Sequence, residues 1–572
     1  TIAGATLTDR RAGVFKSVKS YDGLNSGLVQ NLAELGHANN YNYKWENILT
    51  YNFKIAENHD FTVTGVSSWE HRQSESSLMK GEGMSSDKYL FHNMGAANIQ
   101  KNESDYSMWK NLGFIGRVNY SYLGKYLASV SCRWDGASVL AEGNKWSTYP
   151  AVALGWRINE ESFMENTSEW LSNLKLRLGY GKSGSANINP FTSVSYLESG
   201  YINIGGIKVP TNSFSPNLSN RLLTWENSYN TNVGIDASFL NSRINLTLDW
   251  YNTETKGVIF NRQMPSTMGG ASANAYYTMM QNIARTNNKG IEIALNTMNI
   301  VKKDFTWSST ITFARNNEKI KSLLNGVNEI ISGPEIKRVG EPANSFYHYK
   351  IEGIWQKGEE AEAAIFGKEP GDIKIATKVR KDADGYFYTD KDGKRVPVSK
   401  YTYGADDYQV IGHKTPDWTG GFQNNFTYKD FDLSFFLYAR WGQMIKYGTI
   451  LAYDPTGKKN GPAHFNYWTP DNASNDFPAA NANKELSSYT GYDALQYVDG
   501  SFIKIKNITL GYNLPKSLVE KAKISKLRIY TTIENPFVFA KNHLLEDYDP
   551  EMNGDNDFPL TKQFVVGVNL TF

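Results

Sequence analysis

Apolar and polar residues alternate strictly along residues 232–251, which read NVGIDASFLNSRINLTLDWY. Four apolar residues on odd positions precede a polar turn at 241–243, and four more on even positions follow it. Because successive side chains of a β-strand point to opposite faces, this segment predicts a hairpin with one apolar and one polar face. A half-exposed hairpin of a soluble sandwich shows the same pattern, so one hairpin leaves both interpretations open.

The same alternation recurs along most of the chain and predicts roughly fifteen strands, most of about 8–12 residues. Such lengths suit tilted strands that cross a hydrocarbon core. Residues 1–40 are harder to interpret, although 12–19 and 24–32 each fit a strand. Further strands are expected within 316–418, for example at 345–355.

The connections between these strands alternate between short and long. Tight turns are predicted at 123–125, 241–243 and 429–430, whereas 70–110 and 252–285 read as long polar connections. In outer-membrane barrels the turns on the periplasmic side are short and the external loops are long. A soluble sandwich or propeller has no reason to keep this asymmetry, so the pattern favours a transmembrane barrel.

Composition is compatible with that interpretation. The mean hydropathy is -0.49, and no run of about 18 apolar residues occurs, which excludes a transmembrane helix. Alternating barrel strands, by contrast, are nearly invisible to hydropathy. The last strand carries an apolar stripe that ends on Phe572. A terminal aromatic residue of this kind is the assembly signal of bacterial outer-membrane barrels, although an ordinary edge strand would show the same stripe.

Charge and cysteine content limit the classes of function and the kinds of site that the chain can have. A net charge of +2 gives no electrostatic reason to expect nucleic acid, and the single Cys132 excludes an internal disulfide. The acidic segments 382–392 and 546–557 resemble calcium loops only faintly, because the first lacks the EF-hand spacing and the second also fits a solvated loop. No paired histidine motif, nucleophile elbow or phosphate loop occurs, so we assign no metal, no cofactor and no catalytic residue.

Sugar binding is the better site hypothesis. Trp and Tyr rings stack on the apolar faces of pyranose rings, while neighbouring amide or acid groups bind the hydroxyls. The alternative for each aromatic residue is a place in the girdle at the lipid interface. The candidates for substrate contacts are expected at strand ends or in long loops. They are Arg133, Asp135, Asn144, Trp146, Trp225, Asn227 and Asn230.

Four longer segments identify a protein family more specifically than the alternation of apolar and polar residues does. They are GRVNYSYLGKYLASVSCRWDGASVL, NKWSTYPAVALGWRINEESFM, LTWENSYNTNVGIDASFLNSRINLTLDWYNTET and FIKIKNITLGYNLPKSL. These segments strongly resemble SusC-like TonB-dependent transporters of the SusC/RagA family of Bacteroidota. The resemblance continues through the DPE at 549–551 and covers the chain in the family's order from about residue 40 to Phe572.

The resemblance implies an all-β fold, a large transmembrane antiparallel β-barrel with 22 strands in the complete protein. Residues 1–572 would form a partial barrel without the N-terminal plug, Ton box and first strands, since the chain starts at Thr1 without an initiator methionine. The implied function is active import of oligosaccharides across the outer membrane of a Gram-negative bacterium of the Bacteroidota.

The same resemblance implies a set of partners. A SusD-like surface lipoprotein would act as a lid, and TonB–ExbBD would supply energy through the N-terminal region. Outer-membrane lipid and surface glycan hydrolases or binding lipoproteins complete the set. Three alternatives stay open: a peptide importer of the same family, a passive porin or adhesin barrel, and a soluble all-β glycan-degrading enzyme.

Overall fold

The computed structural model describes residues 1–572 apart from 266, 268–269, 273–274, 325 and 460–464. Strands dominate this structure, and seventeen of them belong to one sheet. The chain divides into two compact units. Unit 1 consists of residues 1–157, 177–232 and 253–285, and unit 2 consists of residues 158–176, 233–252 and 286–572.

Unit 1 is built on six strands, and smaller elements lie in the connections of the unit. The six are β1 (Ile2–Lys16), β2 (Leu32–Ile55), β3 (His59–Met84), β4 (Ala97–Tyr122), β5 (Tyr126–Ala137) and β6 (Trp146–Arg157). The connections hold α1 (Tyr21–Asn25), β8 (Leu197–Ile204), β9 (Ile207–Phe214), β10 (Asn217–Leu218), β13 (Gly270–Ser272) and β14 (Ala275–Tyr276). Four strands contribute residues to both units: β7 (Leu171–Ser185), β11 (Glu226–Phe239), β12 (Ile244–Gln263) and β15 (Thr278–Val301).

Unit 2 has six further sheet strands and longer connections. The strands are β16 (Phe305–Ser322), β26 (Trp418–Tyr428), β27 (Phe431–Trp441), β30 (Phe502–Asn513), β31 (Lys526–Ala540) and β32 (Gln563–Thr571). The connections hold β17 (Glu329–Ser332), β18 (Glu335–Arg338), β19 (Ser345–His348), β20 (Ile351–Ile354), α2 (Glu360–Ile365), β21 (Ile373–Ile375), β22 (Arg380–Asp382), β23 (Gly385–Thr389), β24 (Arg395–Pro397), β25 (Gln409–His413), β28 (Met444–Lys446), β29 (Tyr497–Asp499) and α3 (Lys516–Val519). Within the described residues, no helix has the length and apolar character that crossing a membrane requires.

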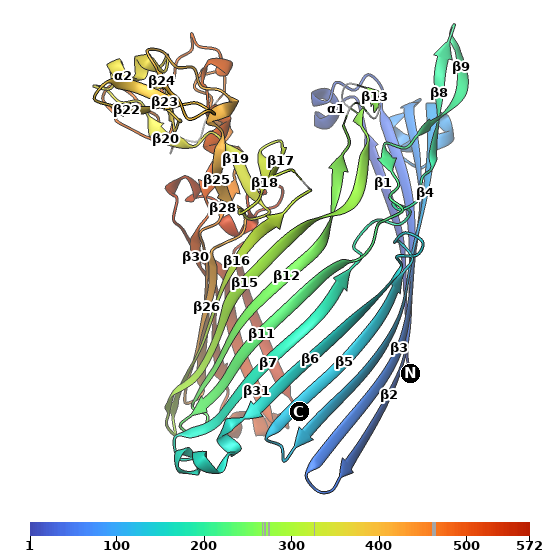
Figure 1. The fold of residues 1–572 in the computed structure, drawn as a ribbon, viewed down its shortest axis with the longest axis vertical. Helices are drawn as coiled ribbons and strands as arrows, with labels where there is room; N and C mark the ends of the chain where they lie inside the picture. Colours follow the sequence, from blue (N-terminus) through green and yellow to red (C-terminus); the bar gives the residue numbers. More distant parts are fainter. Residues whose placement is uncertain (266, 268–269, 273–274, 325, 460–464) are drawn as a thin grey trace. The chain divides into compact units, whose positions relative to one another are not determined.

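The sheet strands of each unit form an antiparallel meander. In unit 1 each strand from β1 to β6 pairs with the next one along the chain, as Figure 1 shows. Val130 of β5 lies opposite Val118 of β4 and Val152 of β6, so apolar residues meet on one face across three strands. In unit 2 the same consecutive pairing joins β16, β26, β27, β30, β31 and β32.

The expected alternation between short and long connections is confirmed for most hairpins, but connection 138–145 before β6 is shorter than connection 158–170 after it. The turn between β4 and β5 spans 123–125, where Leu123 and Gly124 have φ angles of 53° and 68°. Two consecutive left-handed residues match the right-handed twist of the flanking strands and allow a tight hairpin. The turn at 429–430 is equally short. Long connections follow β16, β27 and β31, at 323–417, 442–501 and 541–562.

Two expectations about the first strands are wrong. Residues 24–32 do not form a strand, because α1 begins at Tyr21 with the Ser20 hydroxyl accepting the Gly23 N–H, and β2 starts only at Leu32. Residues 70–110 are not one long connection, since β3 and β4 run through most of this stretch. Each of these strands has 26 residues. The ladder therefore continues beyond the length that a hydrocarbon core requires.

The longer predicted connections also hold more strand than expected. β12 extends to Gln263 and β15 begins at Thr278, so the connection predicted at 252–285 is shorter. Residues 266, 268–269 and 273–274 of that prediction lie outside the described part of the chain. The strand expected at 345–355 is present as two shorter strands, β19 and β20, which are separated by residues 349–350 and belong to different sheets.

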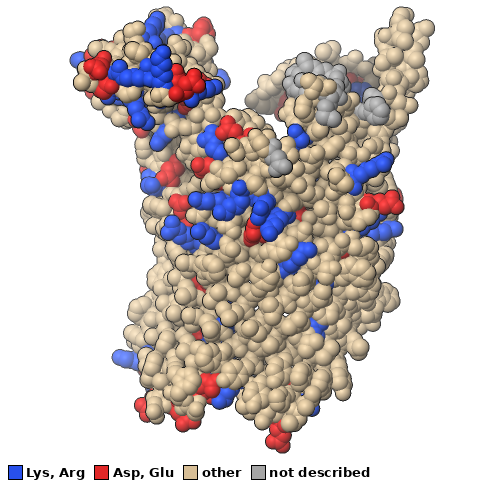
Figure 2. All heavy atoms as spheres, viewed as in Figure 1, with Lys and Arg blue, Asp and Glu red and all other residues tan. Residues whose placement is uncertain are grey.

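The apolar face of the sheet strands is exposed, which reverses the arrangement of a soluble protein. On β5 the side chains of Val130 and Trp134 are 58% and 49% exposed, whereas Asp135 on the opposite face is 6% exposed. The predicted stripe on β32 is also exposed, from Phe564 to Leu570. Figure 2 shows few charged side chains over the middle of the strands in view. A broad exposed apolar surface of this kind suits contact with lipid.

The connections of unit 2 pack around a hydrophobic core of their own. Ile450 and Phe477 come from 442–501, Leu545 comes from 541–562, and all three side chains are fully buried. Ile354 and Ile373 of the connection 323–417 join the same cluster. This core fixes the three connections against one another and so positions the cavity described below.

Candidate functional site

The polar face of β5 carries an ion pair formed by two of the predicted site residues. Arg133 Nε donates a hydrogen bond to Asp135 Oδ2. Asp135 Oδ1 is buried and has no hydrogen-bond partner among the described residues. Gly113 of β4 lies directly opposite Asp135, and a Cβ at Gly113 would come within 2.3 Å of that oxygen. The absence of a side chain at Gly113 therefore makes room for the carboxylate.

Neighbouring strands add cations and aromatic rings to the same face of unit 1. Arg72 of β3 pairs with Glu70 at 2.6 Å and lies 4.9 Å from the ring centre of Trp109 on β4. Lys182 of β7 lies 5.2 Å from the ring centre of Tyr149 on β6. The register places Trp109 opposite Arg72, and Tyr149 opposite Arg133. The Tyr149 ring is 6% exposed and packs in a hydrophobic cluster, so Trp109 is the ring that this face can present beside the paired charges. Such a combination binds polar ligands with apolar faces.

Trp146 begins β6 and Asn144 lies in the connection just before it, so neither belongs to this array. Trp146 pairs with Gly136 and its ring lies 4.6 Å from the ring of Trp134, on the exposed apolar face. That location fits the interfacial girdle, which was the alternative for each aromatic candidate. Asn144 donates its backbone N–H to Ala141 O at 3.0 Å, within the connection between β5 and β6. Substrate contact by these two residues stays a prediction.

Trp225 and Asn227 lie at the start of β11. The Trp225 indole N–H donates to Lys145 O at 2.9 Å, its ring meets the Tyr149 ring edge-on at 5.7 Å, and the side chain is 7% exposed. Asn227 Nδ2 donates to Trp225 O at 3.2 Å. Trp225 therefore helps to hold the connection 138–145 in place. Asn230 is exposed further along β11. The substrate role of these residues is also still a prediction.

The connection 138–145 borders a cavity in unit 1 that the sequence pattern did not indicate. Its volume is about 730 Å³, within the range of small-molecule sites. The wall mixes apolar, hydroxyl and charged side chains, and it includes Ser138, Leu140, Glu142, Lys145, Ser195, Ser219 and Arg221. Glu142 and Lys145 of the wall flank Asn144 in the sequence, so this predicted residue lies near the cavity.

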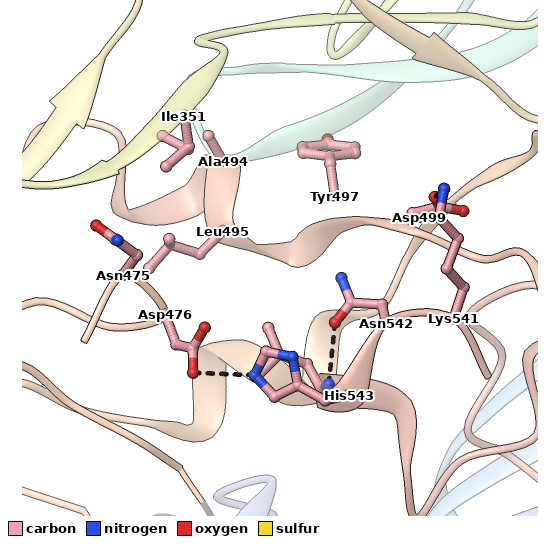
Figure 3. Close-up of a pocket in the computed structure, with 11 residues that line it drawn as sticks. Ile351, Asn475, Asp476, Ala494, Leu495, Tyr497, Asp499, Lys541, Asn542 and His543 are labelled. Carbon is pink, nitrogen blue, oxygen red and sulfur yellow. Dashed lines mark hydrogen bonds and ion pairs between the residues drawn. The ribbon is translucent and has the colours of Figure 1, made fainter. Parts of the chain in front are cut away.

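A second cavity, of about 410 Å³, lies among the connections of unit 2 (Figure 3). Asp476 Oδ2 lies 2.9 Å from His543 Nε2, and Lys541 Nζ donates to Asp499 Oδ2 at 2.7 Å. Both pairs join the connection 442–501 to the segment that follows β31. No residue of this cavity was among the predicted candidates, because its walls come from segments far apart in the sequence.

A buried ion cluster anchors the segment that forms one wall of this cavity. Lys504 of β30 is completely buried and donates to Asp549 Oδ2 at 2.5 Å and to Glu551 Oε2 at 2.9 Å. Lys506 Nζ also donates to Glu551. Burial acts to raise the pKa of Glu551, but the hydrogen bonds from Lys506 and Lys504 lower it below its ordinary value. The DPE at 549–551 is thus held on the strand by two lysines.

The acidic segment at 382–392 forms turns. The Asp384 N–H donates to Asp382 Oδ1, and the Asp392 N–H donates to Asp390 Oδ1, each at 3.0 Å. Both are Asx-type contacts that close the turns around β23. Across the described residues, no group of three or more His, Cys, Asp or Glu side chains gathers as a metal site would require.

An antiparallel meander with an exposed apolar face and long connections is the architecture of a transmembrane β-barrel. The family model described as "TonB dependent receptor-like, beta-barrel" matches residues 4–535. The chain belongs to this family. Its members are receptors and transporters rather than enzymes.

Individual relatives support the same assignment. TonB-dependent receptor P3 of Formosa agariphila is 30% identical over 604 residues, covering 100% of this chain and 56% of that protein. TonB-dependent receptor SusC of Bacteroides thetaiotaomicron is 30% identical over 486 residues, covering 81% and 44%. The chain spans about half the length of the curated relatives it matches. The predicted resemblance to SusC-like receptors is confirmed.

The likeness extends to the fold. The solved structure of the RagAB peptide transporter matches with a TM-score of 0.83 and 23% identity, covering 100% of this chain and 59% of that chain. The predicted all-β barrel class is therefore confirmed. Phe572 is exposed at the end of the chain, and its role as an assembly signal stays a prediction.

Proposed function

We propose that the chain is part of an outer-membrane active importer of oligosaccharides. Two features support this proposal. The exposed apolar face of the strands suits lipid, and the opposite face combines ion pairs with the ring of Trp109. Sugars need both kinds of contact, because their ring faces stack on aromatic side chains and their hydroxyls bind charged or amide groups.

Import in this proposal changes no covalent bond of the substrate. A SusD-like lipoprotein closes over the long connections as a lid, and TonB supplies energy to the complete protein. Substrate then moves along the polar face, where contacts are numerous and individually weak, so that capture and release are both possible. We expect Arg133, whose side chain is 40% exposed, to bind hydroxyls on this path, and the buried carboxylate of Asp135 to hold the guanidinium in position.

Uptake of fluorescent oligosaccharides by cells that carry the full-length transporter tests this function. We expect Trp109→Ala to reduce uptake roughly 5- to 10-fold, as the loss of one stacking ring implies. Trp134→Ala serves as the matched control, because its ring lies on the apolar face, and it should leave uptake unchanged at equal expression. Deletion of TonB should abolish uptake. Uptake that persists without TonB would point to the passive porin.

Peptide import is the second candidate. Two ion pairs of the polar face, Glu70–Arg72 and Arg133–Asp135, support this candidate, because they can bind the charged ends and side chains of peptides. It also draws on the likeness of fold to a protein named as a peptide transporter. Competition separates the candidates: excess unlabelled peptide should leave oligosaccharide uptake unchanged if sugars are the cargo.

A further inference from the structure

The cavity among the connections of unit 2 has walls from three segments of the chain. Ile351 comes from the connection 323–417, the connection 442–501 supplies residues from Asn475 to Asp499, and the segment 541–544 completes the wall (Figure 3). The buried core of these connections and the Lys504 cluster hold the segments together. The cavity is therefore a built feature of unit 2.

The charged side chains of the cavity are already paired within the wall. Asp499 Oδ1 accepts hydrogen bonds from the Ser501 N–H and hydroxyl, and Asp499 Oδ2 accepts one from Lys541. His543 bonds to Asp476. Both pairs are partly exposed, since 50% of the Lys541 side chain and 68% of the His543 side chain are open to solvent. Neutral hydroxyl groups of a ligand can bind beside these pairs without displacing either of them.

Neutral hydrogen-bonding groups face the same space. Asn542 Oδ1 accepts the Leu544 N–H at 2.9 Å and so caps the turn His543–Leu545. Figure 3 shows the NH2 group of Asn542 pointing into the cavity, and no described residue accepts a hydrogen bond from it. A ligand oxygen can bind there without displacing another contact.

An aromatic and aliphatic surface completes the wall. Tyr497 is held by ring contacts with Phe346 at 4.9 Å and with His348 at 5.5 Å. Ile351, Ala494, Leu495 and Leu544 add apolar contacts. A volume of about 410 Å³ suits a ligand of mono- to disaccharide size.

We propose that this cavity is a carbohydrate subsite on the connections of unit 2, which binds one uncharged sugar unit against Tyr497 and donates a hydrogen bond to it from Asn542. The inference deepens the proposed function and rests on it. The subsite captures one unit of the oligosaccharide before the remainder reaches the polar face.

Binding measurements on the full-length transporter, purified in detergent together with its lipoprotein partner, test the subsite. The probes are methyl glucoside, maltose, a fructo-disaccharide and an uncharged capped tripeptide, followed by saturation-transfer NMR and titration. Asn542→Asp keeps the oxygen that caps the turn but removes the NH2 donor, and Tyr497→Ala removes the ring. Asn556→Ala is the matched control on the same segment, since Asn556 is exposed and bonds only to Thr449 among the described residues.

We expect at least one sugar probe to bind, with affinity roughly 5- to 10-fold lower in Asn542→Asp and unchanged in Asn556→Ala. Sugar binding and uptake that are equal in both cavity variants and the wild type would overturn the subsite and leave oligosaccharide import standing. Binding of the tripeptide alone, weakened by Asn542→Asp and without oligosaccharide uptake by cells, would overturn both the subsite and the proposed function.

Discussion

Lys504 Nζ lies 2.5 Å from Asp549 Oδ2, and the lysine side chain is completely buried. The pair joins β30 to the segment that follows β31, and Glu551 binds the same ammonium group. A buried charge is stable only when its partners are in place. The contact therefore locks the segment that carries Lys541, Asn542 and His543.

Substitution of Lys504 tests this anchor. Lys504→Met keeps the side-chain volume but leaves Asp549 and Glu551 without their shared partner, so we expect a loss of about 3 kcal/mol in the free energy of unfolding. Denaturation of the purified protein in detergent measures the loss. Lys458→Met is the control, because its ion pair with Glu485 is exposed, and it should change the free energy by less than about 0.5 kcal/mol. Equal effects of both variants would contradict the anchor.

The same cluster implies a dependence of stability on pH. The pKa of Glu551 in the folded protein is lower than its ordinary value of 4.5, so the unfolded state takes up the proton more readily. The cluster therefore stabilises the fold fully above pH 4.5 and loses that effect as the pH falls through the lower, folded pKa. Melting temperatures measured from pH 7 to pH 3 should fall at the acid end. The fall should be smaller in Lys504→Met, and parallel curves would argue against the assignment.

Gly113 offers a test of the ion pair on the polar face. A Cβ at this position would lie 2.3 Å from Asp135 Oδ1 and 2.9 Å from Ser68 Oγ, so Gly113→Ala must displace the Asp135 carboxylate. We expect roughly ten-fold weaker binding of transported oligosaccharide, with the fold retained. Gly116→Ala, on the same strand, meets no atom within 4 Å and should bind like the wild type. Equal affinities in the two variants would remove Asp135 from the substrate path.

Trp225 separates a structural from a substrate-binding role. Its ring is buried against Tyr149 and its indole N–H donates to Lys145 O, so we expect Trp225→Ala to cost about 3–5 kcal/mol of stability. Trp146→Ala, at a half-exposed ring, should cost much less. Thermal unfolding of both variants in detergent measures the difference. A stable Trp225→Ala protein with impaired sugar binding would instead assign Trp225 to the substrate.

The hairpins were predictable from sequence because their determinants are local. The turn at 123–125 and the pairing of β4 with β5 follow from period-two alternation and a glycine at the turn. The strands within residues 70–110 are not evident from the sequence, because the polar portions of β3 and β4 lack the apolar alternation that marks a strand. In residues 24–32 the apolar pattern is equally ambiguous, because it fits a strand as well as a short helix.

The residues that meet in each site are harder to predict from the sequence than the hairpins. Arg133 and Asp135 are two residues apart on one strand, so their shared face followed from the pattern alone. Lys504 and Asp549 are brought together only by the packing of the connection that follows β31. Asn475 and Asn542 meet in one cavity for the same reason. Contacts of this kind depend on tertiary structure and leave no periodic signal in the sequence.

Cys132 allows the most direct test of the central claim, that the apolar face of the strands contacts lipid. It is the only cysteine of the sequence and is exposed on the face of β5 that carries Val130 and Trp134. A nitroxide attached to Cys132, in full-length protein without other cysteines and reconstituted in a bilayer, reports collisions with lipid-soluble oxygen and with a water-soluble nickel chelate. We expect oxygen to dominate at Cys132 and the chelate to dominate for Ser131→Cys in a Cys132→Ala background. Dominant collisions with the chelate at Cys132 would contradict the claim.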